Sequence, residues 1–377
     1  MFKSFILPSA FLAAMIIGAG VFALPFIFSV AGLPVGFFYL AFFGTVFAVI
    51  HLLYADIIFR TSGERHRFVG YAKIYLGKAG FFVSVFTTAI GLVLALTIYL
   101  VLSASFLNLV FPAIDAFQAI LIFWLAASSF IFLKIENLAN SEVLVAASML
   151  AIIFVVFLFG WFSGEANIAY AEINYAYFLL PFGPVLFALA GRPAISFIVD
   201  YFDHNQLPAA AIKKPIIVGT LVPAAVYLLF VLGILKISPT ISGDAVSGLI
   251  GYLPASFLVA IGLFGLFSLW SSYTIISREV EGIFALDFHL PLSIALIATV
   301  FLPLILYFAG LQNFLVLVAA AGGIFLALES ILVVLMWRAL GKRAIPPLLV
   351  RRVSAPVLFG IILIFMGGML YEILNLL

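Results

Sequence analysis

The chain has 377 residues, of which 67% are hydrophobic and only 8% are charged, and its net charge is +2. A soluble protein carries about 25% charged residues, so this composition excludes a soluble globular protein and predicts an all-α protein with many membrane spans. Cysteine is absent and the four histidines are scattered, which excludes a disulfide framework, a thiol nucleophile and a Cys-ligated metal site.

The first hydrophobic segment, residues 5–30, is long enough to cross a bilayer core of about 30 Å. Its centre contains Gly18 and Gly20, and Pro25 follows. Glycine tolerates non-helical dihedral angles and proline removes a backbone donor, so the segment is predicted to be two half-helices joined by unwound backbone. Within a membrane such backbone survives only where it faces protein, water or a ligand.

Apolar stretches along the rest of the chain predict eleven spans in one transporter domain, residues 1–377. The expected limits are 5–30, 33–59, 80–107, 117–134, 142–163, 176–199, 215–237, 250–275, 290–309, 313–338 and 355–375. With the N-terminus in the cytoplasm, the inner ends and loops collect most of the basic residues, and the positive-inside rule then places the C-terminus outside. These residues are Lys3, Arg60, Arg65, Arg67, Lys73, Lys78, Lys134, Lys213, Lys214, Arg278, Arg338, Lys342, Arg343, Arg351 and Arg352.

The sixth span, from Pro181 to Pro193, is also interrupted by glycine and proline, and its Phe187-Ala188-Leu189 repeats Phe22-Ala23-Leu24. Five spans separate the two interruptions, so residues 5–163 and 176–338 are predicted to be inverted repeats, with 355–375 as one extra helix. Paired, interrupted helices of this kind indicate a transporter site. The alternative is that glycine and proline are simply frequent in membrane helices.

An amino acid zwitterion matches the two kinds of backbone group that broken helices expose. The N–H groups of Gly18, Ala19 and Gly20 are expected to bind its carboxylate. The carbonyls of the second break are expected to bind its ammonium, and Tyr99 adds a hydroxyl or only packs. The candidate residues of this second break are Phe187, Ala188, Ala190 and Gly191.

The eighth span places Ser268, Ser271 and Ser272 on one helix face. With the carbonyls of Ala14 and Ile17, these hydroxyls are predicted to form an all-oxygen Na⁺ site. The alternative is that small residues allow close helix packing. The fifth span has no lysine after Lys134, which favours Na⁺ over H⁺ as the coupling ion, and no other cofactor is expected.

Arg192 directly follows the second break, and Glu329 lies midway along the tenth span. Charges within spans are functional candidates because burying them is costly. Arg192 is expected to bind a substrate carboxylate, including that of an acidic amino acid, or to pair with Glu329 as a gate. A third possibility is that Arg192 only reaches polar backbone beside the break. Asp56, near the inner end of its span, is expected to anchor the membrane interface.

The stretch from Gly18 to Pro25 resembles the first-helix signature of amino acid permeases of the amino acid–polyamine–organocation superfamily. The resemblance is nearest to the amino acid/auxin and bacterial aromatic amino acid permeases. Further similar stretches are 68–78, 187–191 and 218–227, so it covers nearly the whole chain. It implies a five-plus-five inverted-repeat fold of the LeuT type, alternating access, and symport of an amino acid with H⁺ or Na⁺. It also implies that Ser271 and Ser272 occupy the positions of sodium ligands, whereas Arg192 departs from the small or neutral residue usual there.

The sequence therefore predicts a cation-coupled amino acid transporter of the cell membrane, with the bilayer and an amino acid as partners and with neither nucleic acid nor an obligate protein partner. A transporter of another small solute, such as an organic cation, amine or nucleobase, is the alternative, although Arg192 opposes a cation unless Glu329 neutralises it. A membrane-embedded enzyme is not expected, because the spans lack a convergent catalytic cluster. A sensor would need a signalling domain, and a channel would need a ring of like charges. Neither feature is apparent.

Overall fold

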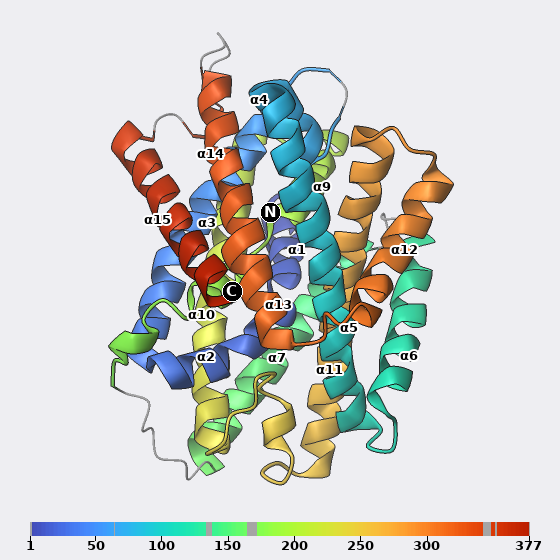
Figure 1. The fold of residues 1–377 in the computed structure, drawn as a ribbon, viewed down its shortest axis with the longest axis vertical. Coiled ribbons are helices and arrows are strands. Elements are labelled where there is room, and N and C mark those ends of the chain that lie inside the picture. The colour runs from blue at the N-terminus through green and yellow to red at the C-terminus, as the bar shows by residue number, and fades with distance from the viewer. Residues whose placement is uncertain are drawn as a thin grey trace.

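The computed structural model describes residues 2–63, 65–132, 138–163, 172–341, 348–350 and 353–376, and the regular elements in these ranges are all helical (Figure 1). Seven of the described helices are long and apolar enough to cross a membrane, or eight when the bent pair Phe2–Ile16 and Ala19–Ala31 is one span. Three shorter apolar helices occupy further expected spans, namely Ala116–Ser129, Ala146–Phe162 and Leu292–Phe308. The expectation of an all-α membrane protein is confirmed.

The first half of the chain contains the first interruption and four further expected spans. Its helices are α1 (Leu7–Ile16), α2 (Leu24–Ala31), α3 (Leu33–Arg60), α4 (Phe68–Ser84), α5 (Ile90–Val110), α6 (Ala116–Ser129) and α7 (Leu138–Ser163). A short 3₁₀ helix, η2 (Ala19–Ala23), precedes α2, and a π-helical turn, η3 (Val85–Ala89), joins α4 to α5.

The second half begins with the other interrupted segment and ends with the extra helix. Its helices are α8 (Phe182–Ala188), α9 (Arg192–His204), α10 (Lys213–Ile237), α11 (Ala255–Gly282), α12 (Leu292–Phe308), α13 (Phe314–Ala320), α14 (Ala327–Gly341) and α15 (Ala355–Leu376). Further π-helical turns are η1 (Phe2–Ile6), η10 (Ile283–Asp287) and η11 (Ala321–Leu326), of which η11 joins α13 to α14.

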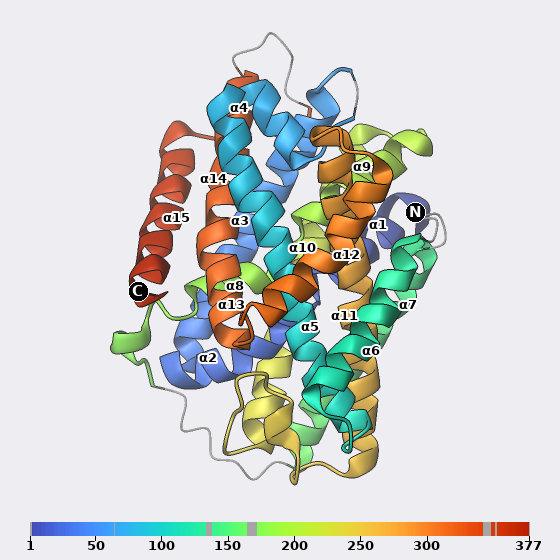
Figure 2. The ribbon, with the colours of Figure 1, turned by 45° about the vertical axis from the view of Figure 1, so that its right-hand side comes forward.

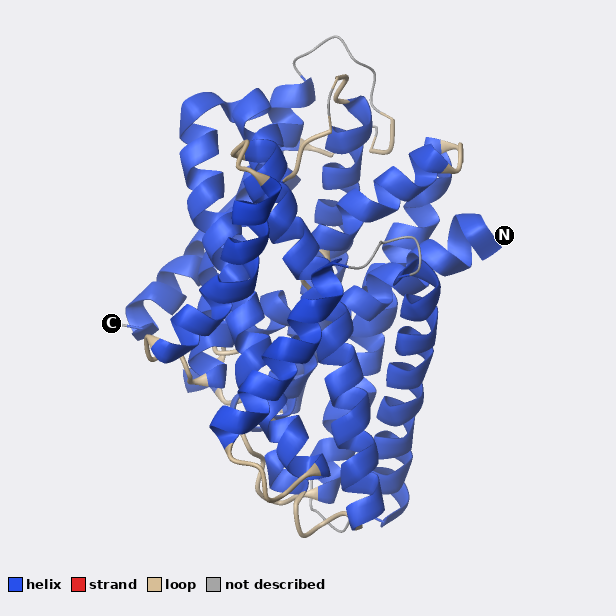
Figure 3. Cartoon of the chain, turned by 90° about the vertical axis from the view of Figure 1, so that its right-hand side faces the viewer, coloured by secondary structure: helices blue, strands red, loops and turns tan. Residues whose placement is uncertain are grey.

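Helices α1 and α8 are buried along almost their whole length, while α1 reaches the side of the molecule that carries the N-terminus and α2 lies in its lower part (Figures 1 and 2). Helix α1 packs against α7 and α10, and α11 packs along α5. Helix α15 packs on α14 and η11, at the edge of the molecule opposite the N-terminus (Figure 3). The backbone polar groups of α1 and α8 are thus enclosed by protein, as broken helices at membrane depth require.

A helical stretch precedes the third span, and a kink at Gly77 separates the two, close to the expected limit of residue 80. Helix α4 starts at Phe68, changes direction at Gly77 and continues through η3 into α5. Gly77 has φ +69°, a left-handed conformation that a residue without a Cβ adopts readily. The connection after α3 is therefore limited to residues 61–67, and Lys73 and Lys78 lie on helix rather than in a loop.

Asp56 is not an interfacial anchor, because its side chain is fully buried. One carboxylate oxygen accepts bonds from Arg60 at 3.0 Å and from the Trp337 indole at 2.8 Å. The other accepts from the backbone N–H groups of Leu348 and Leu349. Asp56 thereby ties α3 to α14 and to the segment that follows it, a contact that span limits alone do not show.

Several of the basic residues on which the predicted membrane orientation depends lie outside the described ranges. They are Lys134, Lys342, Arg343, Arg351 and Arg352. The other inner basic residues lie within the described ranges.

Candidate functional site

The first interruption follows α1 at Ile17 and Gly18. Ile17 has φ −75° and ψ 66°, and Gly18 has φ −112° and ψ −145°, so neither continues the helix. The two halves of this segment meet at an angle of 45°. Because Ala19 and Gly20 form the first turn of η2, their N–H groups have no acceptor within that helix.

The second interruption lies between α8 and α9. Leu189 and Gly191 have ψ values near zero, 4° and 1°, and Pro193 opens α9. The Ala190 N–H donates to the Phe187 carbonyl at 3.2 Å, which closes a short turn instead of a helix. The predicted break in the sixth span is present at the predicted residues.

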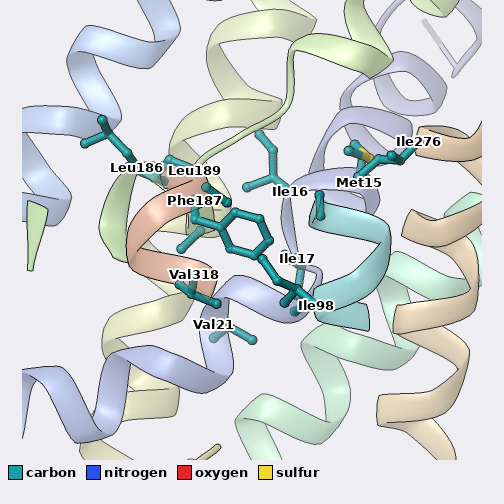
Figure 4. Close-up of a cluster of buried hydrophobic side chains, with 14 of the residues drawn as sticks. Met15, Ile16, Ile17, Val21, Ile98, Leu186, Phe187, Leu189, Ile276 and Val318 are labelled. Atoms are coloured by element: carbon teal, nitrogen blue, oxygen red, sulfur yellow. The ribbon is translucent and has the colours of Figure 1, made fainter. Parts of the chain in front are cut away.

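The two interruptions meet backbone to backbone. A Cβ added to Gly20 would lie 2.4 Å from the Cα of Ala188, so only glycine allows this approach. The Tyr227 hydroxyl of α10 lies 2.5 Å from the Ile16 carbonyl and 2.9 Å from the Ala188 carbonyl, and so links both breaks. Phe187 lies among side chains of both interrupted segments, with Ile17 and Ile98 beside its ring (Figure 4).

A small cavity of about 30 Å³ opens beside this junction. It has room for one or two water molecules, so a bound amino acid requires the surrounding side chains to move outward. Besides the two breaks, its wall comes from α5, α11, α14 and the π-helical turns η3 and η11. The lining residues are Met15, Ile16, Gly18, Ala19, Gly20, Thr87, Gly91, Leu92, Ala95, Tyr99, Phe187, Ala190, Pro193, Ile276, Ala321, Phe325, Leu326 and Glu329.

The serine face of α11 lies against the first break. Ser268 Oγ donates to the Ile17 carbonyl at 2.6 Å, and Ser272 Oγ to the Met15 carbonyl at 3.4 Å. A Cβ on Gly18 would meet Ser272 Oγ at 2.8 Å and the Tyr99 hydroxyl at 3.2 Å. Hydroxyl and carbonyl oxygens thus converge at the end of α1, a donor set suited to a hard cation.

Arg192 is buried and paired with two carboxylates. Its Nε lies 2.5 Å from Glu329 Oε1, and its Nη1 lies 2.8 Å from Glu279 Oε1. The other Glu329 oxygen accepts a bond from Thr88 in η3 at 3.1 Å. The Phe68 ring centroid is 4.7 Å from Arg192 Cζ, within the range of a cation–π contact. This cluster connects α9 to α11, α14 and η3.

Further ion pairs continue from Glu279 to the end of the molecule. Arg67 lies 3.6 Å from Glu279 and 3.6 Å from Asp200. Burial of the Arg67 guanidinium lowers its pKa, but these two carboxylates outweigh burial and raise the pKa above its ordinary value. Arg65 then pairs with Asp200 and Asp203. We call this series, from Arg192 through Glu279 and Arg67 to Asp203, the charge ladder.

The structure brings most of the sequence-predicted substrate residues together. Gly18, Ala19, Gly20, Tyr99, Phe187 and Ala190 line the cavity, as does the gate candidate Glu329. Ala188 and Gly191 pack instead against the first break, Ala188 on Gly20 and Gly191 on Ile16. Arg192 points to its glutamates and is not among the lining residues. Of the sodium candidates, Ser268 and Ser272 contact the break, and Ala14 and Ser271 are buried on the same two helices.

Sequence reasoning missed several residues at this site. Glu279 carries no local motif, and Tyr227 entered only as the end of the similar stretch 218–227, without a role. The importance of both depends on which helices pack together. The cavity residues of the π-helical turns η3 and η11 were also missed, although the adjacent pairs Thr87-Thr88 and Gly322-Gly323 offered a weak signal. π-Helical turns often occur at functional sites.

Comparison with known proteins supplies the decisive observation. The sequence model of the family described as transmembrane amino acid transporter protein matches residues 3–232, more than half of the chain. This chain belongs to that family. The family lies within the amino acid–polyamine–organocation superfamily, so this member is a multi-pass membrane transporter and not an enzyme. A search of curated proteins finds no significant match.

Solved structures show which fold this amino acid transporter family member adopts. One is Mhp1, a nucleobase-cation-symport-1 family transporter in a closed conformation with bromovinylhydantoin bound. It is 13% identical with a TM-score of 0.64, over 87% of this chain and 76% of its own. Another is MhsT in complex with L-phenylalanine, 14% identical with a TM-score of 0.63, over 97% of both chains. The likeness shows the LeuT-type transporter fold.

Proposed function

We propose that this protein is a secondary active amino acid transporter that couples uptake to a cation, with Na⁺ favoured over H⁺. The observation that carries the proposal is the close approach of Gly20 to Ala188 beside the cavity. Two interrupted segments that meet next to enclosed space offer both N–H donors and carbonyl acceptors to a zwitterion. The family supports an amino acid in preference to another small solute.

In the proposed complex, the substrate carboxylate binds the N–H groups of Ala19 and Gly20, and the Tyr99 hydroxyl assists. The Gly18 N–H is already bonded to the Ile16 carbonyl at 2.7 Å, so it does not bind the carboxylate. Gly18 instead lets the substrate come close to the backbone, because it has no side chain. The ammonium binds carbonyls of the second break, near Phe187 and Ala190. Phe187 closes the cavity over the bound molecule.

The proposed Na⁺ ligands are the carbonyls of Ala14 and Ile17 and the side chains of Ser268, Ser271 and Ser272. Both the ion and the substrate then hold the end of α1, so each stabilises the same conformation and raises the affinity for the other. The contact of Ser268 with Ile17 supports this arrangement.

Arg192 and Glu329 are the proposed gate, extended by Glu279. Their pairing joins α9 to α11 and α14 beside the cavity, and the charge ladder continues from there toward the end of the molecule that we propose is cytoplasmic. Opening toward that side requires these buried ion pairs to separate. We further propose that the chain forms eleven spans in two inverted repeats of five plus α15, with the N-terminus inside and the C-terminus outside.

A thermal-shift screen of the purified protein against amino acids, with and without Na⁺, tests this function. Binding to the native state raises the unfolding temperature, and coupling predicts a larger rise with substrate and Na⁺ together than the sum of each alone. Ser268→Ala is expected to abolish this extra rise, whereas Ser129→Ala, an exposed serine that also bonds to its own helix, retains it. The absence of a shift with every amino acid would contradict the proposal.

A further inference from the structure

Glu329 faces the cavity, which its pairing with Arg192 in a gate does not require. It lines the cavity together with the first break, whereas Arg192 and Glu279 do not. Most of the other lining side chains are apolar, and Glu329 is the one charged side chain among the described residues that form this wall. A ligand in the cavity therefore meets a carboxylate before it meets the guanidinium behind it.

The pairing within the cluster leaves Glu329 as the charged group that faces the cavity. Arg192 donates to Glu329 at 2.5 Å and also to Glu279 at 2.8 Å. Glu279 has a second cationic partner in Arg67, at 3.6 Å, whereas Arg192 is the one cationic partner of Glu329 among the described residues. Neither arginine lines the cavity, so the charge offered to a ligand there is that of Glu329.

We propose that the substrate is an amino acid whose side chain ends in a positive charge, and that Glu329 determines this specificity. This inference rests on the proposed function, because it assumes that an amino acid backbone binds at the breaks. A buried cation is tolerated where a carboxylate faces it, and Glu329 is that carboxylate. The apolar wall around Ala95, Ala321 and Phe325 receives the aliphatic part of the side chain, as basic side chains commonly bury their stems.

The same geometry excludes acidic substrates. Arg192 would have to leave two carboxylates and enter the cavity to bind a second carboxylate of the substrate. The substrate carboxylate would also lie next to Glu329, and two like charges in a buried site repel each other. The expectation from the sequence that Arg192 binds an acidic amino acid is therefore replaced by a preference for the opposite charge.

Lysine, norleucine and glutamate are the probes that test this inference. Norleucine has the aliphatic side chain of lysine without the ammonium, so the ratio of their dissociation constants isolates the effect of the charge. With the purified full-length protein in Na⁺, we expect lysine to bind at least about tenfold more tightly than norleucine and glutamate to show no saturable binding. Equal or tighter binding of norleucine or glutamate would overturn the inference.

Two matched variants test whether the preference for lysine depends on Glu329. Glu329→Gln and Glu279→Gln each remove one carboxylate partner of Arg192, but only the first changes the cavity wall. We expect Glu329→Gln to reduce the lysine preference to within about twofold, and Glu279→Gln to retain it. Equal losses in both variants, or an unchanged preference in Glu329→Gln, would refute the role of Glu329.

The outcomes separate this inference from the proposed function. If no member of a panel of the twenty amino acids and norleucine binds to protein that is monodisperse, the proposed function itself fails. If neutral amino acids bind and basic ones do not, only the specificity inference fails. Should Glu329→Gln not yield folded protein, the wild-type ratio of lysine to norleucine still decides, and a ratio of one contradicts the inference.

Discussion

Single side chains hold the junction of the two breaks in place, and Tyr227 is the clearest case. Its hydroxyl reaches the carbonyls of Ile16 and Ala188, although the residue lies on a third helix, α10. The side chain is fully buried, and the Ile16 carbonyl also accepts the Gly18 N–H at 2.7 Å, so the Ala188 carbonyl depends more on this hydroxyl. One hydroxyl therefore couples the positions of both interrupted segments.

Tyr227→Phe keeps the ring and removes only this link. Because a buried acceptor loses its donor, we expect a loss of about 1–3 kcal/mol of stability, measured by thermal or chemical unfolding of the purified protein. We also expect weaker substrate binding, since the breaks are no longer held in register. Tyr252→Phe, at a side chain that is 47% exposed, is the control and is expected to change neither property. A Tyr227→Phe protein with wild-type stability and affinity would contradict this role.

At the scale of helices, the site is made of segments that depart from the α-helix. The two breaks supply backbone, and the π-helical turns η3 and η11 supply Thr87, Thr88 and part of the cavity wall. Helix α8 approaches η11 so closely that a Cβ on Gly322 would lie 1.8 Å from the Gly183 carbonyl. Glu372 of α15 accepts the Gly183 N–H at 2.9 Å and fixes the start of α8.

Gly20→Ala tests the approach of the two breaks. Its Cβ would lie 2.4 Å from the backbone of Ala188, and backbone cannot move aside as a side chain can, so the segments must separate. We expect loss of substrate binding and of transport, with a lower unfolding temperature. Gly360→Ala in α15 is the matched control, because its Cβ would meet nothing within 4 Å and alanine favours a helix. Substrate binding by Gly20→Ala at wild-type affinity would refute the close approach.

The sequence predicted those features that depend on local chemistry. Glycine and proline located both breaks, apolar stretches located the helices, and the spacing of Ser268 and Ser272 placed both on the face that meets α1. Features that depend on packing between distant helices were missed. Glu279 became part of the site only because α9 and α11 lie side by side.

At the scale of the whole molecule, the charge ladder runs from the carboxylate partners of Arg192 to the exposed aspartates of α9. It links α9, α11 and the 61–67 connection through alternating charges, from the buried Arg192 to the half-exposed Asp203. Surface ion pairs contribute little to stability, but separating buried pairs is costly. In the proposed transport cycle, the ladder favours a conformation closed at the proposed cytoplasmic end until substrate and ion bind.

Uptake of radiolabelled amino acids into proteoliposomes under an imposed Na⁺ gradient tests the central claim most directly. The account predicts accumulation above the external concentration that stops when the gradient is collapsed and is absent in Gly20→Ala. Accumulation driven equally by a proton gradient in the absence of Na⁺ would contradict the assigned coupling ion. Failure to accumulate any amino acid under either gradient would contradict the account as a whole.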